Sequence, residues 1–325
     1  MILKDKKIKK EILTDNSKKL NQYQTMLSIR LFEEKIDYFF SKGLLGGTCH
    51  LCIGQEASAV GVISQLQKGD KVVSTHRGHG HAIAMGGNLS LLFAELMEKK
   101  IGYCMGRGGT QHICAKDLGF YGTNGITGGG IPIATGLALA SKRDKKNKIV
   151  VSFFGDGAVN QGTFHESLNM ASIWNLPIVY VCENNLYAMS MPIEKAVKNT
   201  NLASRADSYG IPGVVADGTN IEDVEEKSLK LIKLAREGKG PSLLEIKSYR
   251  YKGHSKSDNR VYRTREEEQN WMKKDGINIL KNKLIKLGLK KEIQEIEEEV
   301  KKTIIDAEKI AIDAEYSTDY ISNVR

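Results

Sequence analysis

Two apolar runs separated by an amphipathic segment constrain the fold of this chain more than any other feature. The runs at 149–154 (IVVSFF) and 178–182 (IVYVC) are rich in β-branched and aromatic residues, which is typical of buried strands. The segment between them has apolar residues on one face of a helix, namely Phe164, Leu168, Ala171 and Trp174. This order predicts a βαβ unit, whose strands are parallel and whose crossover is right-handed.

The sequence also indicates where the helix of this unit begins and ends. Thr163 and Glu166 have the spacing of a capping box, in which each side chain bonds the main-chain N–H of the other residue. Pro177 is expected to stop the helix before the second strand. We therefore predict that Thr163 caps the helix.

The alternation of helix and strand continues on both sides of this unit. A helical stretch at 221–236 is followed by a third apolar run at 242–246, and an amphipathic helix is expected from about 20 to 42, ending at Gly43. The predicted fold class is therefore α/β, with a mostly parallel sheet flanked by helices.

The sequence contains no internal repeat and no low-complexity linker that would divide it. We predict a single domain over residues 1–325. It is expected to carry a basic N-terminal arm at 1–19 and a charged, helical C-terminal tail at 262–325.

The net charge of +9, from 48 Lys and Arg against 39 Asp and Glu, raises the question of an anionic partner. The lysines cluster in the two terminal segments, and no nucleic-acid-binding motif accompanies them. No apolar run approaches the roughly 20 residues that cross a bilayer, and no export signal is present. We therefore predict a cytoplasmic protein with reduced cysteines that binds neither nucleic acid nor a membrane.

Polar residues follow both strands of the βαβ unit. Asp156 comes after the first strand, within Gly-Asp-Gly, and Asn185 comes after the second, within Glu-Asn-Asn. Each group alone is typical of an ordinary turn. Because the carboxyl ends of parallel strands share one edge of a sheet, where ligands bind, the two groups together favour a magnesium-bound diphosphate.

Two other phosphate-binding motifs are excluded. The Rossmann fingerprint fails because Asn160 stands at the position of its third glycine. A P-loop fails because the Gly238-Lys239 pair is followed by Gly240 and not by serine or threonine. The sequence therefore supports neither nicotinamide binding nor nucleotide hydrolysis.

The segment 155–190 (GDGAVNQGTFHESLNMASIWNLPIVYVCENNLYAMS) resembles the thiamine-diphosphate motif of the alpha subunits of two-component 2-oxo acid and acetoin dehydrogenases. Five further segments resemble motifs of these subunits in the same order and spacing: HLCIGQEA (50–57), STHRGHG (74–80), GRGGTQH (106–112), NGITGG (124–129) and YRYKGHSKSDNRVYRTREE (249–267). The resemblance extends from about residue 20 to the end of the chain. It implies the thiamine-diphosphate-binding fold.

The resemblance also implies roles for individual residues. Magnesium would be held by the side chains of Asp156 and Asn185 and by the carbonyl of Tyr187. The diphosphate would contact Gly157, Ala158, His76 and Arg77, although pyruvate-type relatives often carry tyrosine at position 76. Gly125 and Thr127 would meet the aminopyrimidine ring, where many relatives have an aliphatic residue at 127. Two catalytic histidines are implied, His50 facing the substrate and His254 near both the diphosphate and the lipoyl group, and His79 is a further cofactor-binding candidate.

The implied activity needs partners. In this family a glutamate of the beta subunit activates the cofactor, so the chain is expected to work within an α2β2 heterotetramer. The resulting hydroxyethyl-cofactor intermediate would acetylate a lipoyl arm on a separate acyltransferase. Ser255 matches a serine that is phosphorylated in mitochondrial relatives, although the sequence identifies no kinase.

The substrate is left open between several choices. The resemblance is closest to acetoin-type subunits, in which acetoin is cleaved to acetaldehyde and the two-carbon intermediate. Oxidative decarboxylation of pyruvate is the first alternative, and a branched-chain 2-oxo acid is the second. A non-catalytic module that binds magnesium and diphosphate is a fourth interpretation from a different functional class.

The stretch Thr48-Cys49-His50-Leu51-Cys52 contains a C-x-x-C pair, for which a zinc site and a redox couple are the alternatives. A structural zinc site requires a second Cys/His pair, and the other cysteines form no C-x-x-C motif. A redox couple of the thioredoxin type occurs near a βαβ unit, and this segment is not part of one. We therefore expect Cys49 and Cys52 to be packing residues and His50 to be the functional one. His81, His112 and His165 are expected to be structural.

Overall fold

The computed structural model describes residues 2–318, with side chains described from Asp15 onward. Its main sheet has five strands in the order β1-β2-β3-β7-β6, and all four neighbouring pairs are parallel. A two-stranded antiparallel hairpin, β4-β5, lies beside it. The strands are β1 (Lys71–Val73), β2 (Val150–Gly155), β3 (Ile178–Asn184), β4 (Tyr187–Ala188), β5 (Met191–Pro192), β6 (Gly213–Asp217) and β7 (Ser242–Lys247). The predicted α/β class with a mostly parallel sheet is confirmed.

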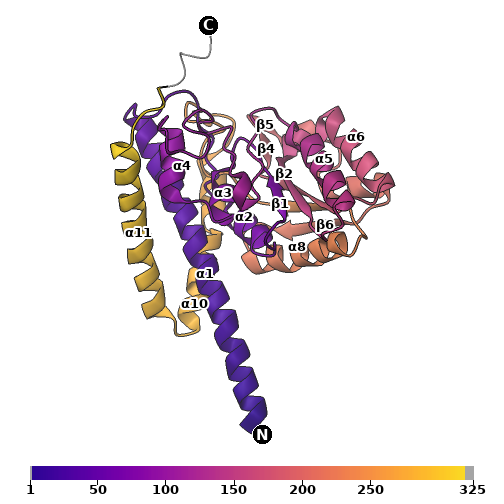
Figure 1. Cartoon of the computed structure of the whole chain (residues 1–325), viewed down its shortest axis with the longest axis horizontal. Coiled ribbons are helices and arrows are strands. Elements are labelled where there is room, and N and C mark those ends of the chain that lie inside the picture. The colour runs from indigo at the N-terminus through magenta and orange to yellow at the C-terminus, as the bar shows by residue number, and fades with distance from the viewer. Residues whose placement is uncertain (1, 319–325) are drawn as a thin grey trace.

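Helices cover both faces of the sheet (Figure 1). The α-helices are α1 (Ile2–Ser41), α2 (Glu56–Ile63), α3 (His79–Ala84), α4 (Leu89–Leu96), α5 (Gly130–Arg143), α6 (Gly162–Ile173), α7 (Ile193–Ala196), α8 (Ile221–Arg236), α9 (Arg265–Met272), α10 (Gly276–Lys286) and α11 (Lys290–Asp313). Three 3-10 helices, at Lys116–Leu118, Asp156–Asn160 and Leu202–Tyr209, complete the described elements. No helix among residues 2–318 is both long and apolar enough to cross a membrane.

The predicted βαβ unit is confirmed as β2-α6-β3, but its helix is capped differently. The helix begins at Gly162, so Thr163 lies inside its first turn. The N-cap residue is Gln161, and its side chain makes no capping hydrogen bond. The predicted capping box is therefore wrong. Phe164, Leu168 and Ala171 are fully buried, whereas Trp174 ends the helix and is 40% exposed.

Successive side chains of the central strands point to opposite faces of the sheet and pack into two separate cores. Val151, Phe153 and Val179 face the core formed with α1, α2, α8, α10 and α11. Val150, Phe154 and Ile178 face the core formed with α5 and α6. Both faces of the sheet are thus buried, which explains why the strands read as continuous apolar runs.

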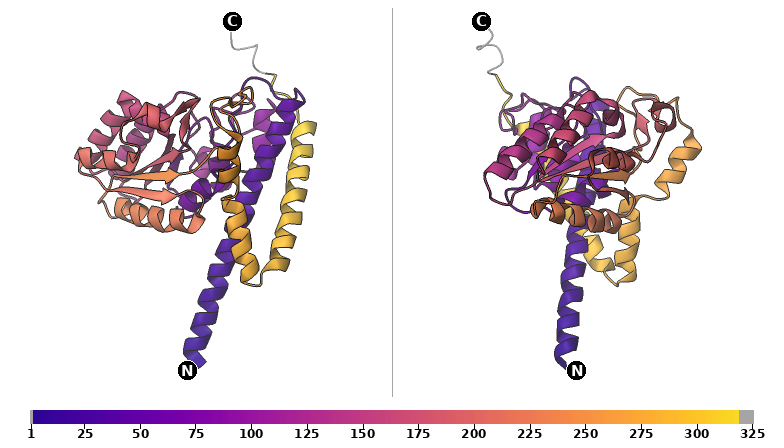
Figure 2. Two further views of the ribbon diagram at one scale, coloured as in Figure 1. Left: turned by 180° about the vertical axis from the view of Figure 1, so that it is seen from behind. Right: turned by 90° about the vertical axis from the view of Figure 1, so that its right-hand side faces the viewer.

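The N-terminal helix is much longer than predicted. It runs without a break from Ile2 to Ser41, where a helix from about 20 was expected, and Gly43 follows it in the left-handed conformation (φ 68°). The intervening sequence contains neither glycine nor proline, so nothing in it breaks a helix. Its N-terminal end extends away from the rest of the molecule, while its C-terminal half packs beside α11 (Figures 1 and 2).

The C-terminal segment forms α9, α10 and α11, in agreement with the helices expected after residue 262. Residues 319–325 of the predicted tail and Met1 of the predicted arm lie outside the described residues.

One face of α1 binds the segments that surround the site described below. Arg30 donates to Glu56 at the start of α2 (2.6 Å) and to Asp275 before α10 (2.7 Å). Glu33 bonds His79 Nδ1 of α3 (2.8 Å). Asp37 pairs with Lys252 (3.0 Å) and Lys256 of the loop after β7.

Candidate functional site

A cavity of about 270 Å³ opens at the carboxyl ends of β2 and β3. Gly155 pairs with Glu183 in the sheet, so the residues that follow these two strands meet at one edge. Nine of the predicted site residues line the cavity: His76, Arg77, Thr127, Asp156, Gly157, Ala158, Asn185, Tyr187 and His254. The structure therefore brings together residues from five separate stretches of sequence.

The oxygen donors at this edge are buried and suit a magnesium ion. The side chains of Asp156 and Asn185 belong to residues that are each 6% exposed. Burial raises the pKa of Asp156 to about 6, against the opposing effect of main-chain N–H donors from Asp156 and Asn185. Leu186 adopts the left-handed conformation (φ 72°), and the chain turns there so that Asn185 Oδ1 accepts from Tyr187 N (3.4 Å). A buried carboxylate beside an amide oxygen is a donor set that a hard cation prefers.

Two buried arginines supply the opposite charge. Arg77 is 5% exposed and Arg250 is 1% exposed. Burial, followed by the charge of Arg250, lowers the pKa of Arg77 to about 9. Among the described residues neither guanidinium pairs with a carboxylate: Arg77 donates to the carbonyls of Leu51 (2.9 Å) and His254 (2.8 Å), and Arg250 to that of Met189 (3.1 Å). Because buried cations are costly without an anion, the cavity is suited to a polyanion.

Further features fit a diphosphate-bearing cofactor held by a metal. Gln55 Nε2 and His76 Nε2 are buried nitrogens without a hydrogen-bond partner among the described residues, and both residues line the cavity. A Cβ on Gly157 would lie 2.8 Å from Ala188 Cβ, so glycine is needed for this close approach. Unpaired polar atoms that face a cavity indicate that a ligand completes their bonds.

Three histidine rings pack together beside the cavity, which His76 and His254 line. The ring of His50 lies 4.6 Å from that of His76 and 4.8 Å from that of His254, measured between centroids. Their nitrogens lie within 4.8 Å of one another, which would permit a metal ion. Arg77 Nη2, however, lies 3.0 Å from His254 Nδ1 and disfavours a cation there. The cluster is therefore better suited to hydrogen-bond an oxygen atom.

These imidazoles are held in the neutral form. Burial is the main cause, and the charge of Arg77 is the second: the pKa falls to about 4 for His50, about 2 for His76 and about 3 for His254. Near neutral pH each ring can therefore donate one hydrogen bond and accept another.

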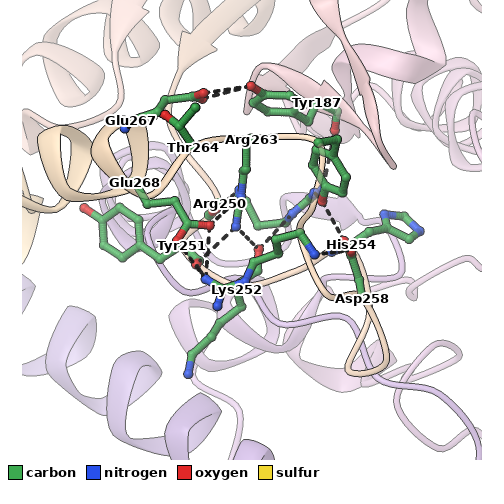
Figure 3. Close-up of polar contacts among 12 residues, drawn as sticks. Tyr187, Arg250, Tyr251, Lys252, His254, Asp258, Arg263, Thr264, Glu267 and Glu268 are labelled. Carbon is green, nitrogen blue, oxygen red and sulfur yellow. Dashed lines mark hydrogen bonds and ion pairs between the residues drawn. The ribbon is translucent and has the colours of Figure 1, made fainter.

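The loop that carries His254 is held in place by Arg263 (Figure 3). Arg263 is 8% exposed and donates to the carbonyls of Arg250 (2.6 Å), Tyr251 (3.2 Å) and Lys252 (2.7 Å). Its Nε bonds Glu268 of α9 (2.7 Å). One guanidinium thus fixes the main chain from which Arg250 and His254 reach the cavity.

Asp258 fixes the other side of this loop (Figure 3). Its carboxylate accepts from His254 N (2.6 Å), Arg260 N (2.8 Å) and Tyr262 OH (2.6 Å). Although burial opposes the shift, these donors lower the pKa of Asp258 to about 2.

Several predicted residues lie elsewhere. His79 is fully buried between Glu33 and Thr110, whose Oγ1 lies 2.9 Å from His79 Nε2, so it supports the site from behind and does not line the cavity. Gly125 is exposed and does not line it either, although its neighbours Asn124 and Ile126 do. His50 does not line the cavity either, but its ring packs against those of His76 and His254, which do.

Cys49 and Cys52 are 1% and 5% exposed, which agrees with a packing role. Burial raises the pKa of both thiols, to about 12 for Cys49, and disfavours the thiolate that redox chemistry needs.

Of the other histidines, only His81 fits the expected structural role fully. It is buried, stacks on Phe153 and bonds Ser74 Oγ (2.8 Å). His165 bonds Tyr209 OH but is exposed, and His112 is also exposed and lines a separate cavity.

Gln55 and Arg250 are site residues to which the sequence assigned no role. Both fall inside segments that carry the family resemblance, 50–57 and 249–267, so those segments held the available signal. That these two residues line the cavity follows from tertiary packing, which the sequence alone does not show.

The histidine cluster predicts acid-sensitive stability. Unfolded histidine has a pKa of about 6.5, so below that pH the unfolded chain binds protons that the folded cluster does not take up until about pH 4 or lower. The contribution of the cluster to stability is therefore present above pH 6.5 and falls as the pH decreases. We expect the free energy of unfolding to be lower at pH 5.5 than at 7.5 in urea titrations. His76→Asn should reduce that difference, whereas the same change at the exposed His165 should not.

Comparison with known proteins places these features in a family. The dehydrogenase E1 component family matches residues 23–318. The chain is 44% identical over 316 residues to the alpha subunit of acetoin:2,6-dichlorophenolindophenol oxidoreductase from Bacillus subtilis, covering 97% of this chain and 95% of the relative.

Pyruvate dehydrogenase subunits are similar to nearly the same degree. The chain is 40% identical over 291 residues to the E1 component subunit alpha of Rhizobium meliloti, covering 89% and 84% of the two chains. It is also 40% identical over 296 residues to the somatic mitochondrial form of Homo sapiens, covering 90% and 75%.

Proposed function

Because the chain belongs to the dehydrogenase E1 component family, whose members depend on thiamine diphosphate, we propose that it is the alpha subunit of an acetoin dehydrogenase. One observation supports this proposal: a buried carboxylate and a buried amide line the same cavity as two buried guanidiniums that have no acidic partner among the described residues. That combination is the complement of a metal-bound diphosphate.

Each charged group then has a role in holding the cofactor. Asp156, Asn185 and the Tyr187 carbonyl would hold Mg²⁺, and Arg77 and Arg250 would neutralise the diphosphate oxygens. Gly157 lets the main chain approach closely, as its contact with Ala188 requires. When bound, thiamine diphosphate supplies the carbon nucleophile that attacks the carbonyl of the substrate.

The histidines would act at the reacting end. His50 and His254 are neutral near pH 7, so they can hydrogen-bond the carbonyl oxygen of a small ketone or 2-oxo acid without a charge of their own. We expect the acetyl group to leave on the lipoyl arm of a separate acyltransferase, with His254 among the cavity residues near that arm.

A beta subunit is expected to complete the site. Among the described residues, the carboxylates that line the cavity are Asp156 and Glu183, and Glu183 is held by Ser58 Oγ (2.7 Å). Neither is free to activate the cofactor, so we assign that role to a glutamate of the partner. Ile126 and Met189 line the cavity yet are 73% and 63% exposed, as side chains that await a covering subunit would be.

Acetoin is preferred over pyruvate on the higher identity to an acetoin-type subunit, and pyruvate is the second candidate. The test is to co-express the chain with its beta partner, add thiamine diphosphate and Mg²⁺, and measure dye reduction with each substrate alone. Faster turnover of acetoin is expected. A preference for pyruvate would overturn the choice of substrate, and cofactor binding without turnover of any such ketone would indicate a non-catalytic module.

A further inference from the structure

Gln111 lies between His50 and Gly125. It belongs to the motif at 106–112, but no role was assigned to it, and it does not line the cavity of the site. Its Nε2 is 3.3 Å from His50 Nδ1. Its Oε1 lies against Gly125, where an added Cβ would come within 2.8 Å of it. The side chain therefore touches both His50 and the segment 124–128 that borders the cavity.

The loop that presents Gln111 is built around one buried carboxylate. Glu95 of α4 is fully buried and accepts four main-chain N–H bonds, from Cys104 (2.7 Å), Gly106 (2.9 Å), Gly108 (2.7 Å) and Gly109 (3.2 Å). Four bonds to one carboxylate fix a glycine-rich segment that has little intrinsic rigidity. Gln111 is thus held at the end of an ordered loop.

The partner of each Nδ1 decides where the proton of a neutral imidazole lies. Arg77 can only donate, so its 3.0 Å contact makes His254 Nδ1 the acceptor and places the proton on Nε2. The Gln111 amide is oriented with its nitrogen toward His50 Nδ1, and an amide nitrogen is a donor, so in this orientation the proton of His50 lies on Nε2. Both rings then present an N–H from their remaining nitrogen.

We propose that Gln111 is a positioning residue that holds His50 as the Nε2–H tautomer, so that His50 and His254 together donate two N–H bonds to the carbonyl oxygen of the substrate. The identity of that oxygen rests on the proposed function, whereas the tautomer does not. As negative charge develops on the oxygen during attack, two neutral donors stabilise it without giving up a proton.

The first test measures the tautomer in the full-length chain. With ¹⁵N-labelled histidine, His50 is assigned by its loss in His50→Asn, and its imidazole ¹⁵N shifts are compared between wild type and variants at pH 7.5. Wild type should show the Nε2–H form, and Gln111→Leu should show a mixture of tautomers. An unchanged shift in Gln111→Leu, or an Nδ1–H form in wild type, would overturn the proposal.

Gln111→Glu provides a second, opposite change. A carboxylate at this place accepts from Nδ1–H, so it should switch the tautomer and raise the pKa of His50 from about 4. The other titratable or charged groups that act on His50 stay the same in this comparison, namely His76, His79, Arg77, Arg250 and His254. An unshifted titration of His50 would count against the contact.

Activity gives a third readout in the assembled complex. Gln111→Leu should lower kcat roughly 10- to 100-fold while leaving cofactor affinity within about twofold, because it removes orientation of His50 and no contact with the diphosphate. Gln294→Leu, a change of the same kind at an exposed site on α11, should alter neither. Equal loss of cofactor affinity would point to a merely structural role. If the complex turned over no ketone, the proposed function would fail and the ¹⁵N result would still decide the tautomer.

Discussion

Asp156→Asn should weaken cofactor binding about 10²- to 10³-fold and remove measurable turnover of the assembled enzyme. The carboxylate is buried, faces the cavity and is the one anionic member of the proposed magnesium set. Removing one partner of a buried charge pair costs roughly 2–5 kcal/mol, and about 1.4 kcal/mol corresponds to a factor of ten. Titration calorimetry with thiamine diphosphate and Mg²⁺ at pH 7.5 measures the loss directly.

The same substitution should not destabilise the chain without cofactor. The folded-state pKa of Asp156, about 6, is raised above its unfolded value, so its contribution to stability is lost as the pH rises through 6. At pH 7.5 the ionised group is a cost that asparagine removes, and the urea midpoint should stay or rise.

Asp217→Asn is a matched control, since Asp217 ends β6 of the same sheet but is exposed, and its carboxylate accepts from the main-chain N–H (2.9 Å) and the hydroxyl (2.7 Å) of Thr219. It should bind cofactor like wild type. Tight binding by Asp156→Asn would show that the metal site lies elsewhere.

Arg263→Met should release the loop that carries His254 and lower kcat/KM by at least about 10²-fold. Arg263 holds three consecutive carbonyls and Glu268, so its loss leaves buried acceptors unpaired at a cost of about 1–3 kcal/mol each. We expect faster proteolysis between 250 and 262 and weaker cofactor binding, because Arg250 loses its fixed main chain.

Arg260→Met is the matched control. Arg260 binds the same Glu268 (3.0 Å) and reaches one of the loop carbonyls, that of Tyr251, at 3.4 Å, but its side chain is 38% exposed, and exposed ion pairs contribute about 0–1 kcal/mol. Its proteolysis rate and cofactor affinity should stay close to wild type. If both variants behaved alike, the contacts that the two arginines share, with Glu268 and the Tyr251 carbonyl, would hold the loop, and the bonds of Arg263 to the carbonyls of Arg250 and Lys252 would not.

The sheet edge could be predicted because its signal is local. The two apolar runs and the polar residues after them lie within 40 residues, and parallel pairing alone brings Asp156 and Asn185 together. The helix start could not be placed from the capping-box spacing, because the 3-10 turn at 156–160 sets where α6 begins.

The supporting residues could not be predicted because their partners are distant in sequence. Arg77 meets His254 across 177 positions, and Glu33 meets His79 across 46. His79 was predicted to bind the cofactor because it belongs to a motif of the family, but in the structure it is buried against Glu33 of α1. No periodicity in the sequence indicates that Glu95 organises the loop before Gln111.

The contacts of α1 have a mechanical consequence. Arg30, Glu33 and Asp37 follow one another at spacings of three and four, so they lie on one face of a continuous helix. Through these residues α1 contacts Glu56 of α2, His79 of α3 and the loop that carries His254. A shift of α1 along its axis would move all three attachments in one direction at once. The relative positions of α2, His79 and the His254 loop therefore depend on the position of one helix.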